Sequence, residues 1–452
     1  MDDLRALFAQ TAELAAGFYD SLDDRAVFPR ATVDEVRAGF AAPLPEVPTP
    51  APQVIEELAA AADPGLVAEP GGRYFGFVIG GAVPVSIAAD WLTSTWDQNA
   101  GLYVGGPAAS VVEEVAGAWL IELLGLPRHA SFGFVTGAQT ATFTALAAAR
   151  HHVLKHTGWD VERDGLTGAP RIRVVVGEKR HGTVDRALRM LGLGAPTDVV
   201  GADSNGRMLT EELRLTDEPT IVCAQAGEVN TGAFDRFDPL ADARDAAANS
   251  WLHVDGAFGL WANVSPSLRH LVEGVERADS WAVDSHKWLN VPYDNAVAFT
   301  AHPESHSGAF SARAAYLVFD AQTRDQLDWN PEHSRRARGF TVYAAIRALG
   351  RSGIREIVER CCAHARTFAV GLTDLGAEVL NDVDLNQVLF RFETDEDTAR
   401  ILRAVQEEGS SWMGGTVWEG RQAIRISVSN WQTSDEDVER TLDAYAGQLA
   451  AR

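Results

Sequence analysis

Hydrophobic side chains recur at helical spacing at the start of the chain. Wound into an α-helix, these positions share one face and predict an amphipathic N-terminal helix. That face must be covered by the chain's own core or by another subunit. Prolines crowd residues 43–52, and because proline removes backbone donors, we expect an extended linker there. The apolar positions of the helix are Leu4, Leu7, Phe8, Leu14 and Phe18.

From about residue 110, short apolar runs alternate with helical patterns. The stretch 140–154 has the pattern of a helix. Strands alternating with helices are typical of a mostly parallel sheet covered on both faces, so we expect an α/β fold. The apolar runs predict strands at 132–135, 171–176, 220–224, 251–254 and 280–283.

The pattern changes after about residue 335. A long helical stretch, 339–374, precedes short predicted strands near 387–392 and 423–428, and a final helix starts at Asp435. This order predicts a small α+β C-terminal domain. We therefore expect three parts: a helical segment with the linker (1–70), a large domain (71–335) and a small domain (336–452).

Composition narrows the class of protein. Of 452 residues, 46% are hydrophobic and 23% charged, which is enough to bury a substantial core. The net charge of −24 argues against nucleic acid or an anionic membrane as a partner, because both need a basic face. Three cysteines, two of them adjacent, fit neither a disulfide framework nor a metal site. With no secretory signal and no bilayer-length apolar run, the sequence predicts a cytoplasmic protein.

Lysine is rare in this chain. Of 39 basic residues only Lys155, Lys179 and Lys287 are lysines. Lysine, unlike arginine, can lose its proton when desolvated and form a Schiff base. Lys287 follows an apolar run and lies between His286 and Trp288, which favours a catalytic role; a lysine that packs its stem is the alternative.

Three further polar clusters fall at the ends of predicted strands, where open α/β sheets bind ligands. Small residues in 136–140 favour an anion at a helix start, although an ordinary turn has the same composition. His181 follows the strand 171–176, and Asp255 ends the strand 251–254. A packed or capping histidine and a turn-capping aspartate are the alternatives.

Taken in order, these clusters suit a pyridoxal phosphate (PLP) site. The blocks 251–258 and 281–288 resemble those of the group II PLP-dependent amino-acid decarboxylases, which act on aromatic amino acids, glutamate and histidine. The resemblance runs from about Tyr74 to Asn430. It implies fold type I of the PLP-dependent transferases, aspartate aminotransferase-like, with a mostly parallel, mixed seven-stranded sheet and a small α+β domain. It also implies a homodimer with shared active sites.

The resemblance assigns roles to individual residues. Lys287 would form the Schiff base, and Asp255 would keep the pyridine nitrogen protonated. The Ala257 methyl and the His181 ring would cover the two ring faces. Relatives carry asparagine where this chain has Asp284, and since a carboxylate repels phosphate, we expect no direct contact there. The remaining cofactor residues implied are Gly137, Ala138 and Gln139 at the phosphate and His286 beside the lysine.

The same resemblance suggests how the reaction would be directed. Arg425 matches a position proposed to hold the substrate carboxylate; a strand arginine paired with a surface acid is the alternative. Tyr316 matches the loop tyrosine that returns a proton, and relatives with phenylalanine there form aldehydes instead. Phe77 and Asn99 would line the substrate pocket, partly from the second subunit. The polar Asn99 and small Gly101 argue against an aromatic substrate.

The favoured interpretation is decarboxylation of an L-amino acid to its amine and carbon dioxide, with the substrate open. Another PLP reaction is the first alternative: an aminotransferase, a carbon–carbon lyase or an aldehyde-forming oxidase has the same lysine and aspartate. A non-catalytic relative that serves as a scaffold is the second.

Overall fold

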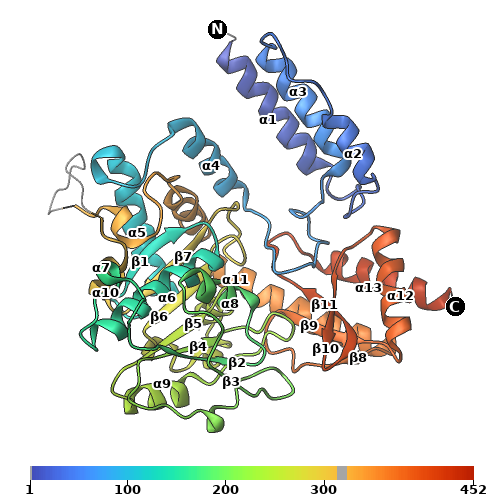
Figure 1. Cartoon of the computed structure of the whole chain (residues 1–452). Helices are drawn as coiled ribbons and strands as arrows, with labels where there is room; N and C mark the ends of the chain where they lie inside the picture. The colour runs from blue at the N-terminus through green and yellow to red at the C-terminus, as the bar shows by residue number, and fades with distance from the viewer. Residues whose placement is uncertain (1–2, 313–322, 452) are drawn as a thin grey trace.

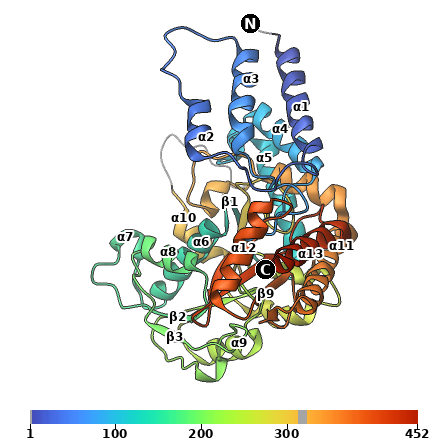
Figure 2. The same cartoon turned by 90° about the vertical axis from the view of Figure 1, so that its right-hand side faces the viewer.

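The structure is a computed structural model that describes residues 3–312 and 323–451. Its N-terminal part is helical, with α1 (Leu4–Asp20), α2 (Val33–Phe40) and α3 (Ala51–Ala62). None of these helices contains a buried residue. Figure 1 and Figure 2 both show α1 and α3 side by side, standing away from the rest of the chain. The proline-rich connection lies between α2 and α3, and α3 has a proline in its first turn, where the missing N–H costs nothing.

A seven-stranded sheet forms the centre of the large domain. The strand order is β1-β7-β6-β5-β4-β2-β3, and β7 runs antiparallel to both of its neighbours while the other pairs are parallel. The predicted mixed, mostly parallel sheet is therefore confirmed. Its strands are β1 (Ser131–Val135), β2 (Arg173–Gly177), β3 (Asp198–Val200), β4 (Thr220–Gln225), β5 (Ser250–Asp255), β6 (Ser280–Asp284) and β7 (Ala296–Thr300).

Helices cover this sheet, and α6 packs against β5, β6 and β7. The central strands are buried on both faces, so they appear in the sequence as unbroken apolar runs. The helices are α4 (Pro84–Trp96), α5 (Pro107–Leu123), α6 (Ala138–Lys155), α7 (Val161–Asp164), α8 (Gly182–Met190), α9 (Phe237–Ala246) and α10 (Pro303–Phe310). Short 3₁₀ turns lie at Asp63–Gly65, Tyr103–Gly105, Thr210–Glu212, Gly259–Val264, Arg269–Val272, Val275–Arg277 and Gln326–Trp329.

The C-terminal part has a four-stranded antiparallel sheet of order β10-β11-β9-β8. The long helix α11 (Gly339–Asp374) was expected to be continuous, but Gly350 has φ 60° and ψ 178°, so two helical segments meet there. Glycine adopts this conformation without the clash that a Cβ would cause. The other elements are β8 (Glu378–Val379), β9 (Gln387–Arg391), α12 (Asp395–Glu408), β10 (Gly414–Trp418), β11 (Arg421–Ser427) and α13 (Asp435–Ala450).

No helix in the described part of the chain is long and apolar enough to cross a membrane.

Candidate cofactor site

The carboxyl ends of β2, β5 and β6 meet at one edge of the large sheet. β5 ends at Asp255, β6 ends three residues before Lys287, and His181 follows β2. Parallel strands place their carboxyl ends together, so residues far apart in sequence become neighbours. Charges on His181, Lys287 and Asp284 all act on the Asp255 carboxyl. The structure therefore brings the four together.

Lys287 is held by contacts on several sides. Its Nζ lies 3.0 Å from Asp284 Oδ2 and 5.9 Å from the centre of the Phe258 ring. Asn290 Nδ2 donates a hydrogen bond to the Lys287 carbonyl at 3.2 Å. A Cβ at Gly80 would lie 1.8 Å from that same carbonyl oxygen, so only glycine permits the close approach. The amine consequently has a defined position at the sheet edge.

Asp255 is a buried acid beside positive charge. Burial raises the pKa of its carboxyl, whereas the charges of His181 and Lys287 and a bond from the Ala257 N–H act in the opposite direction. A cavity of about 10 Å³ adjoins the carboxylate and is lined by His181 and Cys223 among others. A protonated ring nitrogen placed here would favour the ionised carboxylate that burial alone disfavours.

His181 caps the helix that follows it. Its Nδ1 accepts hydrogen bonds from the Thr183 N–H at 3.3 Å and from the Thr183 hydroxyl at 2.8 Å. Because a backbone N–H can only donate, Nδ1 is the acceptor of that bond. The capping alternative raised by the sequence is thus realised. The side chain remains exposed, so capping and ring stacking are compatible.

The start of α6 supplies backbone donors beside the lysine. Gly137 precedes the helix without a side-chain cap, and the Ala138 N–H donates to Asp284 Oδ1 at 2.6 Å. Free N–H groups at a helix start attract anions. A Cβ at Gly137 would lie 3.7 Å from His286 Cε1, which places the turn next to the lysine segment. Gln139 Nε2 donates to a carbonyl of α8 at 3.3 Å.

Two hydrogen bonds to backbone carbonyls fix Ala257 and His286, the remaining predicted cofactor residues. The Asp284 N–H donates to the Ala257 carbonyl at 2.9 Å, which ties the end of β6 to the turn after β5. His286 Nδ1 is 3.0 Å from the Asn295 carbonyl, and burial lowers the pKa of His286. A neutral imidazole here donates to that carbonyl through Nδ1.

Arg425 is a buried cation without a carboxylate partner. It is 9% exposed, and its Nη1 donates to the Val229 carbonyl. No carboxylate oxygen of the described residues lies within 4.0 Å of the Arg425 guanidinium, the distance at which the two would form an ion pair. Burial lowers the pKa of Arg425, and the charge of Glu228 opposes that shift. The alternative of a strand arginine paired with a surface acid therefore has no support in the described residues.

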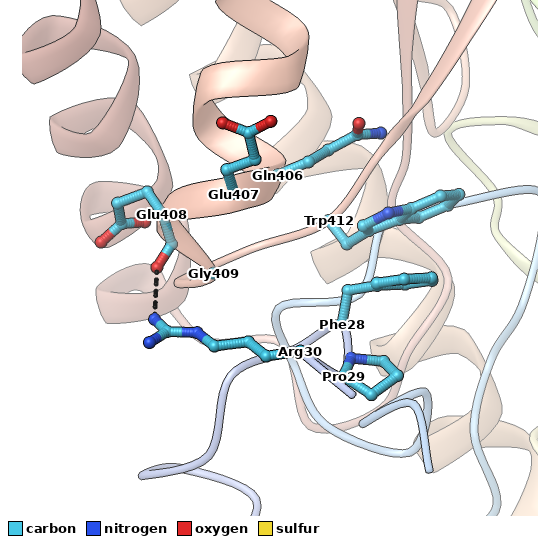
Figure 3. A pocket seen from close by; sticks show the side chains of 8 residues that line it. All are labelled: Phe28, Pro29, Arg30, Gln406, Glu407, Glu408, Gly409 and Trp412. Carbon is cyan, nitrogen blue, oxygen red and sulfur yellow. Dashed lines mark hydrogen bonds between the residues drawn. The ribbon is translucent and has the colours of Figure 1, made fainter. Parts of the chain in front are cut away.

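Phe77 lies in an aromatic stack that the sequence did not predict. Its φ of 51° is unusual for a side chain of this size, and the ring is 5.9 Å from the centre of Trp412. Trp412 also stacks on Tyr74 and on Phe28, as Figure 3 shows for the latter pair. A Cβ at Gly76 would collide with the Trp412 ring.

The stack borders a cavity of about 750 Å³ between α12 and the segment after α1. Its lining contains none of the residues that hold Lys287 or Asp255, so it is a separate hollow. Trp412 had no local signal in the sequence, because it reaches Phe77 only through the tertiary fold. Phe258 did have one, since it directly follows the Asp255–Ala257 turn.

Asn99, like Phe77 and Arg425, shows no contact with Lys287 or Asp255 in the described residues. Asn99 Oδ1 accepts hydrogen bonds from the Gly101 N–H and the Arg335 N–H, at 3.0 and 3.3 Å. Within one chain its side chain thus stabilises a turn, and no contact to Lys287 is found in residues 3–312 and 323–451. Tyr316 lies outside the described residues.

Comparison with known proteins identifies the family. Residues 34–393 match the model of the pyridoxal-dependent decarboxylase conserved domain, which covers most of the chain. The chain belongs to this family. It is 26% identical to tryptophan decarboxylase 1 of Oryza sativa subsp. japonica, over 95% of this chain and 90% of the relative. It is also 24% identical to a phenylacetaldehyde synthase of a Rosa hybrid cultivar, over 94% and 89% of the two chains.

Solved structures share the fold. The Oryza sativa TDC crystal structure with PLP and tryptamine gives a TM-score of 0.91 at 23% identity, covering 100% of this chain and 98% of that one. Mouse CSAD in apo form gives 0.89 at 20% identity, covering 98% of each. The chain is thus a PLP-dependent decarboxylase-family enzyme with the fold of these proteins. The amine of Lys287 and the buried Asp255 fit that cofactor. The uncapped start of α6 fits its phosphate, although the Ala138 amide there is bonded to Asp284.

Proposed function

We propose that this enzyme converts an L-amino acid into the corresponding amine and carbon dioxide, with Lys287 as the residue that binds the cofactor aldehyde. The supporting observation is that the Lys287 amine and the buried Asp255 carboxylate lie at one sheet edge. PLP, when bound, withdraws electrons from the bond that breaks. The protein selects which bond that is by orienting the substrate.

Each residue of the site has a proposed task. Asp255 holds the proton of the ring nitrogen, and Ala257 and His181 support the two faces of the ring. The amides of residues 137–139 bind the phosphate, with His286 beside them. Three properties of Arg425 support a role in holding the substrate carboxylate: it is buried, charged and without a carboxylate partner in the described residues. Carboxylate binding fixes the direction of the bond to be broken.

An aldehyde-forming reaction is the specific alternative, because phenylacetaldehyde synthases are among the relatives. Tyr316 favours the amine, since by the family resemblance a tyrosine at this position returns a proton to the substrate carbon. Tyr316→Phe should shift the product towards aldehyde and ammonia while cofactor binding is kept. An unchanged amine yield would assign the proton to another donor.

The substrate panel should include aromatic amino acids, for which several relatives are named. The polar Asn99 and the small Gly101 are expected to disfavour them, and the panel tests that expectation directly. Purified enzyme incubated with each L-amino acid should release carbon dioxide and amine in equal amounts. Keto acid without carbon dioxide would indicate an aminotransferase, and aldehyde with ammonia an oxidase.

We further propose a homodimer in which a second copy covers the N-terminal helices. Large apolar side chains on α1 and α3 are exposed, and neither helix contains a buried residue. A groove of about 940 Å³ runs between them. Helices of this length are marginal without packing, and exposed apolar surfaces of this kind mark association sites. The exposed side chains include Leu4, Phe8, Leu14, Val54 and Leu58.

A further inference from the structure

The Asp284 carboxylate contacts the Ala138 N–H and the Lys287 amine directly, and its Oδ1 also lies 3.5 Å from His286 Nε2. It is 2% exposed and ends β6. Its Oδ1 accepts the hydrogen bond of the Ala138 N–H at 2.6 Å, and its Oδ2 lies 3.0 Å from Lys287 Nζ. One side chain therefore links the first amide of α6 to the amine of the lysine.

The backbone of Asp284 is fixed from three directions. Its N–H donates to the Ala257 carbonyl, and its own carbonyl accepts from Trp261 Nε1 at 3.4 Å. Ala296 of β7 lies opposite it in the antiparallel pairing. The carboxylate is consequently confined to the space between α6 and Lys287.

This position conflicts with an incoming phosphate. An anion at a helix start uses the free amides of the first turn, and Asp284 already uses that of Ala138. Two anions close together in a partly buried site repel strongly, because the protein screens charge less than water does. Asp284 also contributes to the raised pKa of Asp255, so it acts on both ends of the site.

Its pairing with Lys287 acts in the same direction. Lys287 Nζ lies 3.0 Å from Asp284 Oδ2, so the amine must leave this contact before it can reach the aldehyde of the cofactor. Asp284 thus opposes both the ionic and the covalent attachment of the cofactor.

We propose that Asp284 is a positioning residue that orients Lys287 and the start of α6 before the cofactor arrives, and that its negative charge keeps PLP binding weak. The inference rests on the proposed cofactor site at Lys287. The family implies only that a phosphate binds nearby, whereas this role follows from the two contacts of the carboxylate in this chain.

The variant Asp284→Asn separates charge from shape. The asparagine amide oxygen can still accept from the Ala138 N–H, while its NH₂ group can donate to a phosphate. If Asp284 were merely structural, the exchange would weaken PLP binding or leave it unchanged. If its charge opposes the cofactor, the exchange strengthens binding.

We would measure dissociation constants by quenching of tryptophan fluorescence in the full chain after removal of cofactor. Asp284→Asn should lower the dissociation constant for PLP at least about fivefold. Pyridoxal, which lacks the phosphate, should gain less. Weaker or unchanged PLP binding would overturn the proposal, as would an equal gain for pyridoxal. Asp284→Ser, also neutral, should change PLP affinity in the same direction if the asparagine variant folds poorly.

Asp279→Asn is the matched control. Asp279 is also buried, at 3% exposure, but it pairs with Arg244 and His302 at the other end of β6. Its exchange should lower the melting temperature without changing the ratio of PLP to pyridoxal affinity. A shift of that ratio as large as in Asp284→Asn would overturn the assignment to Asp284.

Borohydride reduction and peptide mapping of the unchanged enzyme separate this inference from the function. Cofactor fixed to Lys287 supports the site, and the affinities then decide the role of Asp284. Cofactor fixed elsewhere would overturn both.

Discussion

The cofactor edge of the large sheet and the N-terminal helices differ in how far one chain completes them. At the sheet edge, Lys287, Asp255 and Asp284 are buried or largely buried; Lys287 pairs with Asp284, and the charges of both act on the Asp255 carboxyl. In α1 and α3 the apolar side chains face outwards and no residue is buried. One chain therefore brings together the groups proposed to hold the cofactor, while α1 and α3 leave an apolar surface uncovered.

The largest expected effect concerns the cofactor edge. Lys287→Ala should remove the only proposed covalent attachment and lower activity by about 10³-fold or more, since key catalytic groups contribute on this scale. Borohydride treatment followed by mass spectrometry should find no fixed cofactor. Lys155→Ala, at the exposed end of α6, is the control and should keep both properties. Cofactor still fixed in the Lys287 variant would refute the assignment.

The second prediction tests the helices. Leu14→Asp combined with Leu58→Asp places charge on the exposed apolar surface of α1 and α3, which should convert the dimer to monomers. Because shared sites would be lost, activity should fall at least ~10-fold. Sedimentation velocity measures the mass directly. Val370→Asp, at an exposed position of α11, is the control and should leave the mass unchanged. A dimer that survives the double exchange would disprove this interface.

A smaller effect is expected at Arg425, which connects β11 of the C-terminal sheet to the Val229 carbonyl of the large domain. Arg425→Met removes a charged hydrogen-bond donor worth about 1.5–3 kcal/mol, so KM should rise roughly 10- to 100-fold. Arg425→Lys keeps the charge and should have an intermediate effect. Steady-state kinetics alongside melting temperatures distinguishes binding from folding. An unchanged KM with a lowered melting temperature would make Arg425 a structural residue.

The smallest effect concerns the loss of folding stability in acid. This loss should arise in the part of the chain after residue 70 and not in the N-terminal helices α1 to α3. Burial lowers the pKa of His253 and of His306 to about 3, and residues 1–70 contain no histidine. The unfolded chain binds these protons below about pH 6.5, whereas the folded chain resists until about pH 3. Stability should therefore be complete above pH 6.5 and decline as the pH falls through that window.

Each such histidine contributes at most about 1.4 kcal/mol per pH unit to this decline. Melting temperatures between pH 7 and pH 5 measure it, and His306→Gln should flatten the curve. A variant with the same slope as the unchanged enzyme would show that His306 is not a source of the acid sensitivity.

The carboxyl edge of the large sheet could be predicted because the burial of each strand is visible in the sequence as an apolar run. Strands buried on both faces must be apolar, and the polar residue that ends such a run marks the carboxyl edge of the sheet, as Asp255 does at the end of β5. The break at Gly350 was missed, because helical periodicity continues on both sides of a glycine. Trp412 was missed because its stacking on Phe77 depends on contacts between distant segments. Asn99 remains a predicted pocket residue, because its hydrogen bonds within one chain serve a turn and the predicted pocket lies partly at a second subunit.

The antiparallel strand β7 has a consequence for how the chain is made. In the part of the chain that the structure describes, β1 is an edge strand paired with β7, and Ser131 pairs with Thr300 across a separation of 169 residues. During synthesis β1 leaves the ribosome long before β7 has been made. Its backbone N–H and C=O groups therefore have no strand to pair with until residues 296–300 have emerged. Closing so long a loop is slow. The large domain should therefore acquire its final strand order only after the ribosome has passed residue 300.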